Sequence, residues 1–168
     1  MITPKLRFSE FKSNWQNVKL SHVIKSLDAG ISVNSEDITP NENEYSVLKT
    51  SCVTTGYFDG NERKRVKDET EISRLKEPLL DNSILISRMN TPLLVGMNAY
   101  VKKAPKNTFL PDRLWQVKIN EITANTLWLA FYLGSKKGLG QIQDLATGTS
   151  NSMKNITKSD VLQQELFA

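Results

Sequence analysis

The segment from Ser83 to Lys118 constrains the fold most, because short apolar runs alternate in it with polar, basic runs. The apolar runs are 84–87, 95–101 and 114–119, and prolines separate them. Short apolar runs between turn residues predict buried β-strands joined by exposed loops. A rigid β scaffold that carries basic, amide-rich loops favours a surface that binds an anion, and nucleic acid is the first candidate.

The rest of the chain adds short strands and short helices to this scaffold. Loose alternation predicts strands at 18–20 and 45–48 and a final strand near the C-terminus, and Cys52 lies in a β-like run. Helices are predicted at 21–27 with Ser21 as N-cap, at 69–75, at 126–135 and at 141–145. Residues 31–43 are predicted as a loop. The fold class is therefore α/β (α+β): a mixed, twisted β-sheet globule with short flanking helices.

Length and composition fit a single domain. The chain has 168 residues, of which 39% are hydrophobic and 24% charged, and this size is enough to bury a core without disulfides. The single cysteine excludes an internal disulfide and fits a reducing cytoplasm. No apolar run reaches the ~20 residues of a membrane span. We therefore expect one domain over 1–168, with 1–14 as a polar N-terminal lead, and no membrane partner.

Charge is unevenly distributed along the chain. The overall net charge is +4, but 31–62 carries six acids and one lysine, whereas 83–118 carries six Lys/Arg and one acid. This uneven distribution of charge indicates either a nucleic-acid-binding face or the surface of mixed charge that is ordinary for a soluble protein.

The chain lacks the usual marks of an enzyme. His22 is its only histidine and is predicted in a buried helix or at a strand edge; Cys52 has no histidine near it in sequence. No Cys or His spacing typical of a metal site occurs, and the glycines at 134, 138 and 140 lack the spacing of a phosphate-binding loop. We expect no catalysis, no metal and no cofactor.

Residue chemistry suggests which side chains would contact DNA. An arginine fork fits guanine, and an asparagine amide fits adenine, whereas lysines suit phosphate. The same residues also fit polar or flexible loops without a ligand, and Trp115 fits the core. The residues expected to read base edges are Arg88, Asn90, Arg113 and Asn151. The residues expected to contact phosphates are Lys102, Lys103, Lys106, Lys136, Lys137 and Lys154.

Four segments, taken in order and spacing, resemble the specificity subunit of type I restriction-modification systems. The first is Lys5-Leu-Arg-Phe-Ser-Glu-Phe-Lys-Ser-Asn-Trp15 followed by Val18-Lys-Leu20. The second is Tyr45-Ser-Val-Leu-Lys49 with Gly56-Tyr57-Phe58. The third runs from Asn82-Ser-Ile-Leu-Ile-Ser-Arg88 to Val95-Gly96, although Asp81-Asn82-Ser83 stands where Gly-Asp is usual. The fourth runs from Gly148-Thr-Ser150 to Lys154-Asn-Ile156.

The resemblance implies a target recognition domain, which reads one half of a bipartite site in double-stranded DNA. Such a subunit does no chemistry itself. It positions methyltransferase (modification) subunits, which use S-adenosylmethionine, and motor-nuclease (restriction) subunits, in the bacterial cytoplasm. The recognition loops of such domains vary, so the resemblance leaves the roles of the residues above as hypotheses.

The resemblance also leaves alternatives open. The family subunit has two recognition domains joined by long helices, whereas this chain stops at Leu166-Phe-Ala168, about where the first such helix would begin. We therefore expect one recognition domain, either an excised domain or a truncated product. Two other readings remain: a non-catalytic protein-interaction fragment without DNA binding of its own, and the recognition domain of a single-chain restriction-methylation enzyme.

Overall fold

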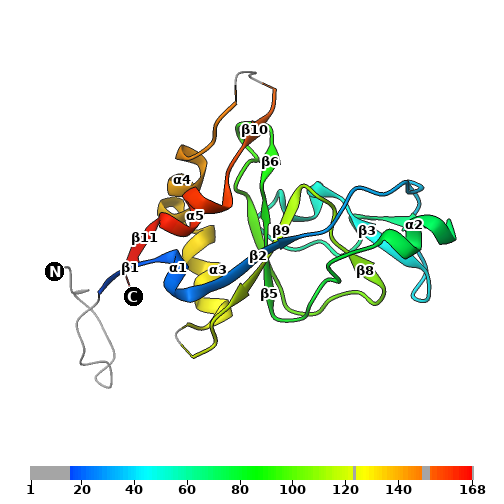
Figure 1. Ribbon diagram of the computed structural model, residues 1–168, viewed down its shortest axis with the longest axis horizontal. Coiled ribbons are helices and arrows are strands. Elements are labelled where there is room, and N and C mark those ends of the chain that lie inside the picture. The colour runs from blue at the N-terminus through cyan, green and yellow to red at the C-terminus, as the bar shows by residue number, and fades with distance from the viewer. Residues whose placement is uncertain (1–15, 123, 149–151, 168) are drawn as a thin grey trace.

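The computed structural model describes residues 16–122, 124–148 and 152–167 of the chain. It is an α+β structure with short helices and several sheets, as the sequence predicts (Figure 1). The strands are β1 (Asn17–Lys19), β2 (Ile24–Ala29), β3 (Tyr45–Leu48), β4 (Arg63–Val66), β5 (Ser83–Ser87), β6 (Met89–Asn90), β7 (Asn98–Val101), β8 (Thr108–Phe109), β9 (Leu114–Ile119), β10 (Lys154–Asn155) and β11 (Glu165–Phe167). The helices are α1 (Leu20–Val23), the 3-10 helix η1 (Thr50–Val53), α2 (Glu69–Arg74), α3 (Thr126–Gly134), α4 (Lys136–Asp144) and α5 (Lys158–Gln163).

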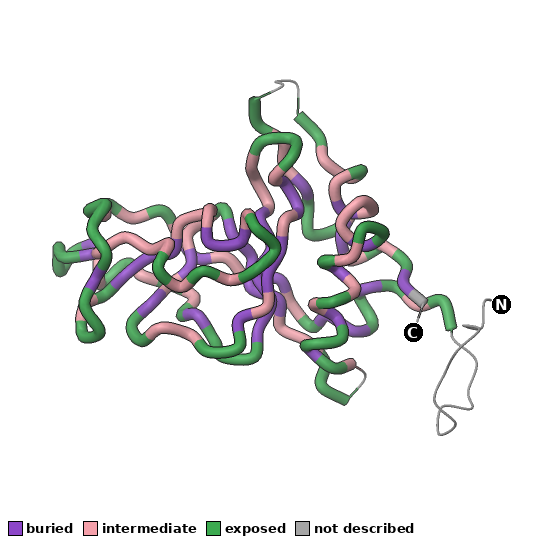
Figure 2. The backbone as a smooth tube through the Cα atoms, turned by 180° about the vertical axis from the view of Figure 1, so that it is seen from behind, coloured by how far each residue is buried: buried purple, intermediate pink, exposed green. Residues whose placement is uncertain are grey.

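A central antiparallel sheet organises the molecule. Its strand order is β2-β9-β5-β7, and β5 forms the middle with a partner on each side. Every residue of β5 is buried. Figure 2 shows the burial concentrated where these strands cross the centre of the molecule, with exposed loops around it. The predicted strands at 84–87 and 114–119 therefore form the core of the sheet.

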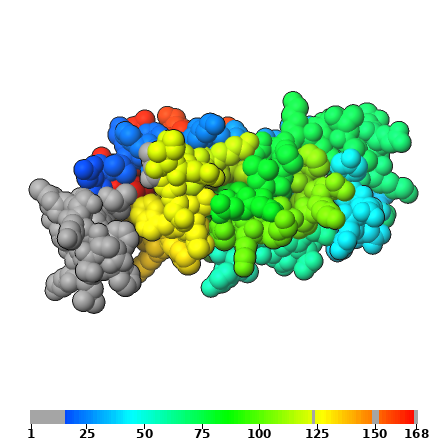
Figure 3. Space-filling model, turned by 90° about the horizontal axis from the view of Figure 1, so that it is seen from below, coloured from blue at the N-terminus to red at the C-terminus, as the bar shows by residue number. Residues whose placement is uncertain are grey.

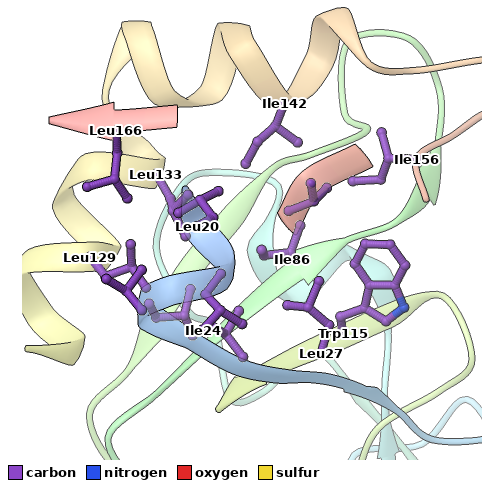
Figure 4. Packing of buried hydrophobic residues seen from close by; sticks show 14 of the residues in the cluster. Leu20, Ile24, Leu27, Ile86, Trp115, Leu129, Leu133, Ile142, Ile156 and Leu166 are labelled. Carbon is purple, nitrogen blue, oxygen red and sulfur yellow. The ribbon is translucent and has the colours of Figure 1, made fainter. Parts of the chain in front are cut away.

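Both faces of the central sheet are covered by apolar side chains. Successive residues of each strand point to opposite faces, so one strand can contribute side chains to both. Ile84 and Ile86 point to the helical side, where α1, α3, α4 and α5 supply the apolar side chains of one core (Figure 4). Trp115 belongs to this core, as predicted, and is 1% exposed. Leu85 points to the other side, into a second core that includes Cys52 and Leu110.

The second core is closed by a smaller sheet of order β4-β3-β8. Strand β3 pairs antiparallel with β4 and parallel with β8, so this sheet is mixed. Two further strand pairs join distant parts of the chain: β1 with β11, and β6 with β10. The first of these pairs brings the two ends of the described chain together (Figure 1).

A buried polar network links the central sheet to the loop before β5. The Gln116 side chain is fully buried; its amide donates to Glu77 Oε1 at 2.6 Å and to the Pro78 carbonyl at 3.1 Å, and it accepts from the Leu80 N–H at 2.8 Å. Lys118 lies beside this network, 3.0 Å from both Glu77 and Asp28. Burial acts to raise the pKa of Asp28, but hydrogen bonds from Ser26 and Lys118 outweigh it, so that pKa is lowered.

Several local predictions were wrong. Residues 24–29 form strand β2 instead of the second half of a helix, because they pair with β9. The predicted strand at 95–101 begins only at Asn98, since Gly96 has a φ of +80°. Cys52 lies in η1 instead of a β-like run, and the helix predicted at 141–145 begins already at Lys136, so that Gly138 and Gly140 lie inside α4. His22 is exposed on α1 instead of buried.

Candidate nucleic-acid interface

Four of the residues expected to contact DNA lie together at one end of the central sheet: Arg88, Asn90, Arg113 and Lys154. Asn90 and Lys154 face each other in the β6–β10 pair. The Arg88 N–H donates to the Arg113 carbonyl at 3.0 Å, and the Arg88 carbonyl accepts from the Ile156 N–H at 3.0 Å. We call this group the basic end. Strand pairing holds the backbone of the basic end in place. A rigid backbone of this kind can position side chains that recognise a ligand.

Arg88 and Asn90 use part of their hydrogen-bonding capacity locally. Arg88 Nε donates to the Asp112 carbonyl at 2.7 Å, which orients the guanidinium. Asn90 Nδ2 donates to Ser87 Oγ at 3.2 Å, and Asn90 Oδ1 accepts from the Thr91 N–H at 2.9 Å. A carboxamide has two N–H groups and two lone pairs, so one of each remains for a ligand. These bonds orient both side chains without exhausting their donors.

Arg113 is exposed and lines a cleft of about 450 Å³ next to the basic end. Lys49 and Lys64 line the same cleft, together with Asp37 and Asp112. Lys64 lies on β4 between Arg63 and Arg65. Because alternate residues of a strand point to opposite faces, Lys64 faces away from its two neighbours. Arg65 is paired instead with Glu36 and Glu44, at 2.5 Å and 3.1 Å.

Sequence analysis missed Lys49 and Lys64 as members of this surface. The alternation along Arg63-Lys64-Arg65 was an available signal for Lys64, but its proximity to Arg113 depends on the second sheet. Lys49 Nζ lies 2.6 Å from Asp37 Oδ1, and this contact raises the pKa of Lys49 and lowers that of Asp37. The Lys49 charge is therefore partly compensated, and the three cations that line the cleft outnumber its two acids by one.

The structure does not bring Lys102, Lys103 and Lys106 to the basic end. They follow β7, whose last residue Val101 pairs with Ser83 at the opposite end of β5. Four residue steps along an extended strand place the two ends of β5 ~13 Å apart. Lys103 also forms an ion pair with Asp81 at 2.6 Å. The Ala104 N–H and Lys103 together lower the pKa of Asp81, so Lys103 has a local partner in this loop.

The remaining candidates lie elsewhere. Lys136 and Lys137 occupy the exposed first turn of α4, after the N-cap Ser135. The far end of α4 approaches the loop after β6, where Gln143 Nε2 donates to the Leu93 carbonyl at 3.1 Å. These two lysines therefore form a third group, separate from the basic end. Lys154 Nζ donates to the Gly148 carbonyl at 2.7 Å. Asn151 falls outside the described residues.

The described residues contain no group of three or more His, Cys, Asp or Glu side chains that could hold a metal ion. Burial raises the pKa of the Cys52 thiol to about 12, so the thiol stays protonated at neutral pH. None of the helices in the described ranges combines the length and apolar character needed to span a membrane.

Comparison with known proteins finds a likeness among solved structures. No protein-family model matches the sequence, and no curated protein matches it. The crystal structure of a type I restriction-modification system S subunit from M. genitalium is similar, with a TM-score of 0.60 and 22% sequence identity. The match covers 98% of this chain and 36% of that one, so this chain spans about a third of the S subunit's length. This chain therefore shares its α+β fold with one part of a type I S subunit.

Proposed function

We propose that this chain is a DNA target recognition domain of a type I restriction-modification specificity subunit. Residues 1–168 would form one domain that reads one half of a bipartite site in double-stranded DNA and does no chemistry of its own. Its partners would be the methyltransferase and motor-nuclease subunits, in the bacterial cytoplasm. The observation that carries the proposal is the fold shared with an S subunit over 98% of the chain.

The basic end supports DNA as the ligand. It joins three side chains predicted to read base edges, Arg88, Asn90 and Arg113, to Lys154, whose charge suits phosphate, and the adjacent cleft adds Lys64. Asn151 remains a predicted base contact, and Lys154 a predicted phosphate contact at the basic end. The other predicted phosphate contacts are Lys102, Lys103, Lys106, Lys136 and Lys137, and a duplex seated at the basic end would meet these five only by extending along the length of the sheet.

The test is binding to a randomised duplex pool at low salt, followed by sequencing of the retained DNA. Enrichment of one short motif supports a recognition domain. Salt-dependent retention that enriches no motif would mean that the chain binds DNA through its positive charge without recognising a sequence. An absence of retention by the folded protein would favour the protein-interaction reading.

Two charge-matched variants locate the interface. Lys64→Gln with Lys154→Gln removes two positive charges at the basic end and its adjacent cleft, whereas Lys102→Gln with Lys106→Gln removes two at the opposite end. Each lost phosphate contact should reduce the slope of log affinity against log salt by about 0.9. We expect the first variant to lose nearly two contacts and the second to lose fewer. Equal losses would contradict a footprint centred on the basic end.

A further inference from the structure

An apolar groove lies away from the basic end, between α3 and the free side of the central sheet. Its volume is about 480 Å³, and it is lined by Tyr57, Phe58, the β7 residues 98–100 and the face of α3 that carries Leu127 and Phe131. Tyr57 and Phe131 are 81% and 73% exposed. Figure 3 shows the α3 region beside the segments around residues 80–110 on the lower face of the molecule.

Strand β7 presents an open edge to this groove. It is the last strand of the central sheet and pairs, within the described chain, with β5 alone. The Ser87 N–H donates to the Met97 carbonyl, and the Gly96 N–H donates to the Ser87 carbonyl. Because bonded pairs alternate along an antiparallel ladder, Ala99 and Val101 bond to β5, whereas the backbone groups of Asn98 and Tyr100 face outward.

The Asn98 side chain adds an acceptor to the lining of the groove. It is 4% exposed, and its Nδ2 donates to the Gly96 and Leu133 carbonyls, each at 3.1 Å. Its Oδ1 lies on the groove side, 3.7 Å from where a Cβ on Gly134 would stand. A carboxamide oxygen accepts up to two hydrogen bonds, so this position suits a ligand that brings an N–H.

Positive charge borders the groove. Lys102 and Lys136 lie within two residues of lining residues, whereas Asp59 is the one acid of the sequence that does so. Lys136 in the first turn of α4 also opposes the helix dipole, which favours negative charge at that position. An occupant with acidic flanks would compensate both effects.

We propose that this groove binds an extended, acidic peptide segment of a partner protein, which adds as a strand to β7 and inserts an aromatic side chain between Tyr57 and Phe131. The outward backbone groups of Asn98 and Tyr100 would form the ladder. An indole N–H would satisfy Asn98 Oδ1, and acidic flanks would face the lysines. This site is separate from the basic end and does not depend on DNA binding.

The test uses an array of acetylated heptapeptides with a central Trp, Tyr or Phe, Val or Ile beside it, and Asp or Glu at both ends. The fluorescein-labelled lead peptide Asp-Glu-Val-Trp-Val-Glu-Asp is titrated by anisotropy. We expect a Kd of about 100 µM or tighter. N-methylation of one alternate set of peptide amides should abolish binding, and methylation of the other set should leave it unchanged. If N-methylation of either set of amides leaves binding equally strong, or if no peptide of the array binds, the proposal of strand addition is wrong.

Amide exchange locates the bound strand. The peptide should slow exchange at Asn98 and Tyr100 and leave Ala99, already bonded to β5, unchanged. Phe131→Ser should weaken binding at least about tenfold, as expected for a central aromatic contact. Leu93→Ser, which changes an equally exposed apolar residue outside the groove, should have no effect. If duplex DNA protects Asn98 and Tyr100 and the peptides do not, the groove belongs to nucleic acid and the proposal is wrong.

Discussion

Replacing Gln116 by leucine tests whether the buried polar network holds the loop before β5. Gln116→Leu keeps the approximate volume of the side chain but removes three hydrogen bonds, to Glu77, Pro78 and Leu80. Glu77 retains Lys118 at 3.0 Å, so its carboxylate stays paired. The Pro78 carbonyl and the Leu80 N–H lose the partner that Gln116 provides.

The expected loss follows from these two groups. Each unsatisfied buried backbone group costs ~1–3 kcal/mol, and partial access of water near the exposed Leu80 favours the lower values. We therefore expect the free energy of unfolding to fall by about 3 kcal/mol, a large part of the ~5–15 kcal/mol typical of a domain. With a urea m-value of ~2 kcal/mol/M, the midpoint should fall by about 1.5 M.

The measurement is urea unfolding followed by tryptophan fluorescence. Gln163→Leu is the matched control, because it makes the same change at an exposed position, where it removes one solvent-exposed hydrogen bond from Lys19 Nζ and effects stay within ~0.5 kcal/mol. Exchange of the Leu80 amide should accelerate in Gln116→Leu even under native conditions. A loss of stability no greater than that of the control, with Leu80 exchange unchanged, would refute the role assigned to Gln116.

Three further predictions concern helix packing, acid stability and DNA reading. Gly138→Ala should destabilise the protein by about 2 kcal/mol or more in urea, because the new Cβ would stand 2.1 Å from the Tyr132 carbonyl oxygen. Gly140→Ala meets no atom within 4 Å and should instead stabilise α4 by ~0.5–1 kcal/mol; the same sign for both variants would contradict this packing. Since folding lowers the pKa of Asp28 from 3.8, its contribution is present above pH 3.8 and is lost as pH falls through the lower folded value. Asp28→Asn should therefore reduce the fall of the urea midpoint as the pH is lowered below 3.8. An unchanged dependence of the midpoint on pH would count against this role of Asp28. Arg88→Ala should relax preference at one base position by ~1–3 kcal/mol in a binding-site selection, whereas an equal loss on every sequence would assign Arg88 to phosphate.

The sequence alone determined the elements whose signals are local. The strands predicted at 45–48, 84–87 and 114–119 follow from short apolar runs bounded by turn residues. Helix α2 begins where Asp68 caps the N–H groups of Thr70 and Glu71. Helix α3 likewise begins after Asn125, whose side chain accepts from the Trp128 N–H. These patterns act over a few residues, so no knowledge of distant contacts is needed to find them.

Only the tertiary structure decided the elements and the surfaces that depend on distant partners. Residues 24–29 have no local preference strong enough to fix them, and they become a strand because β9 supplies the hydrogen bonds. In the same way, pairing along β5 separates Arg88 from Lys102, and the second sheet brings Lys64 to Arg113. The charge pattern of the sequence left open a binding face or an ordinary mixed surface, and the positions of the charged residues depend on strand register, which is set by contacts between residues far apart in the chain.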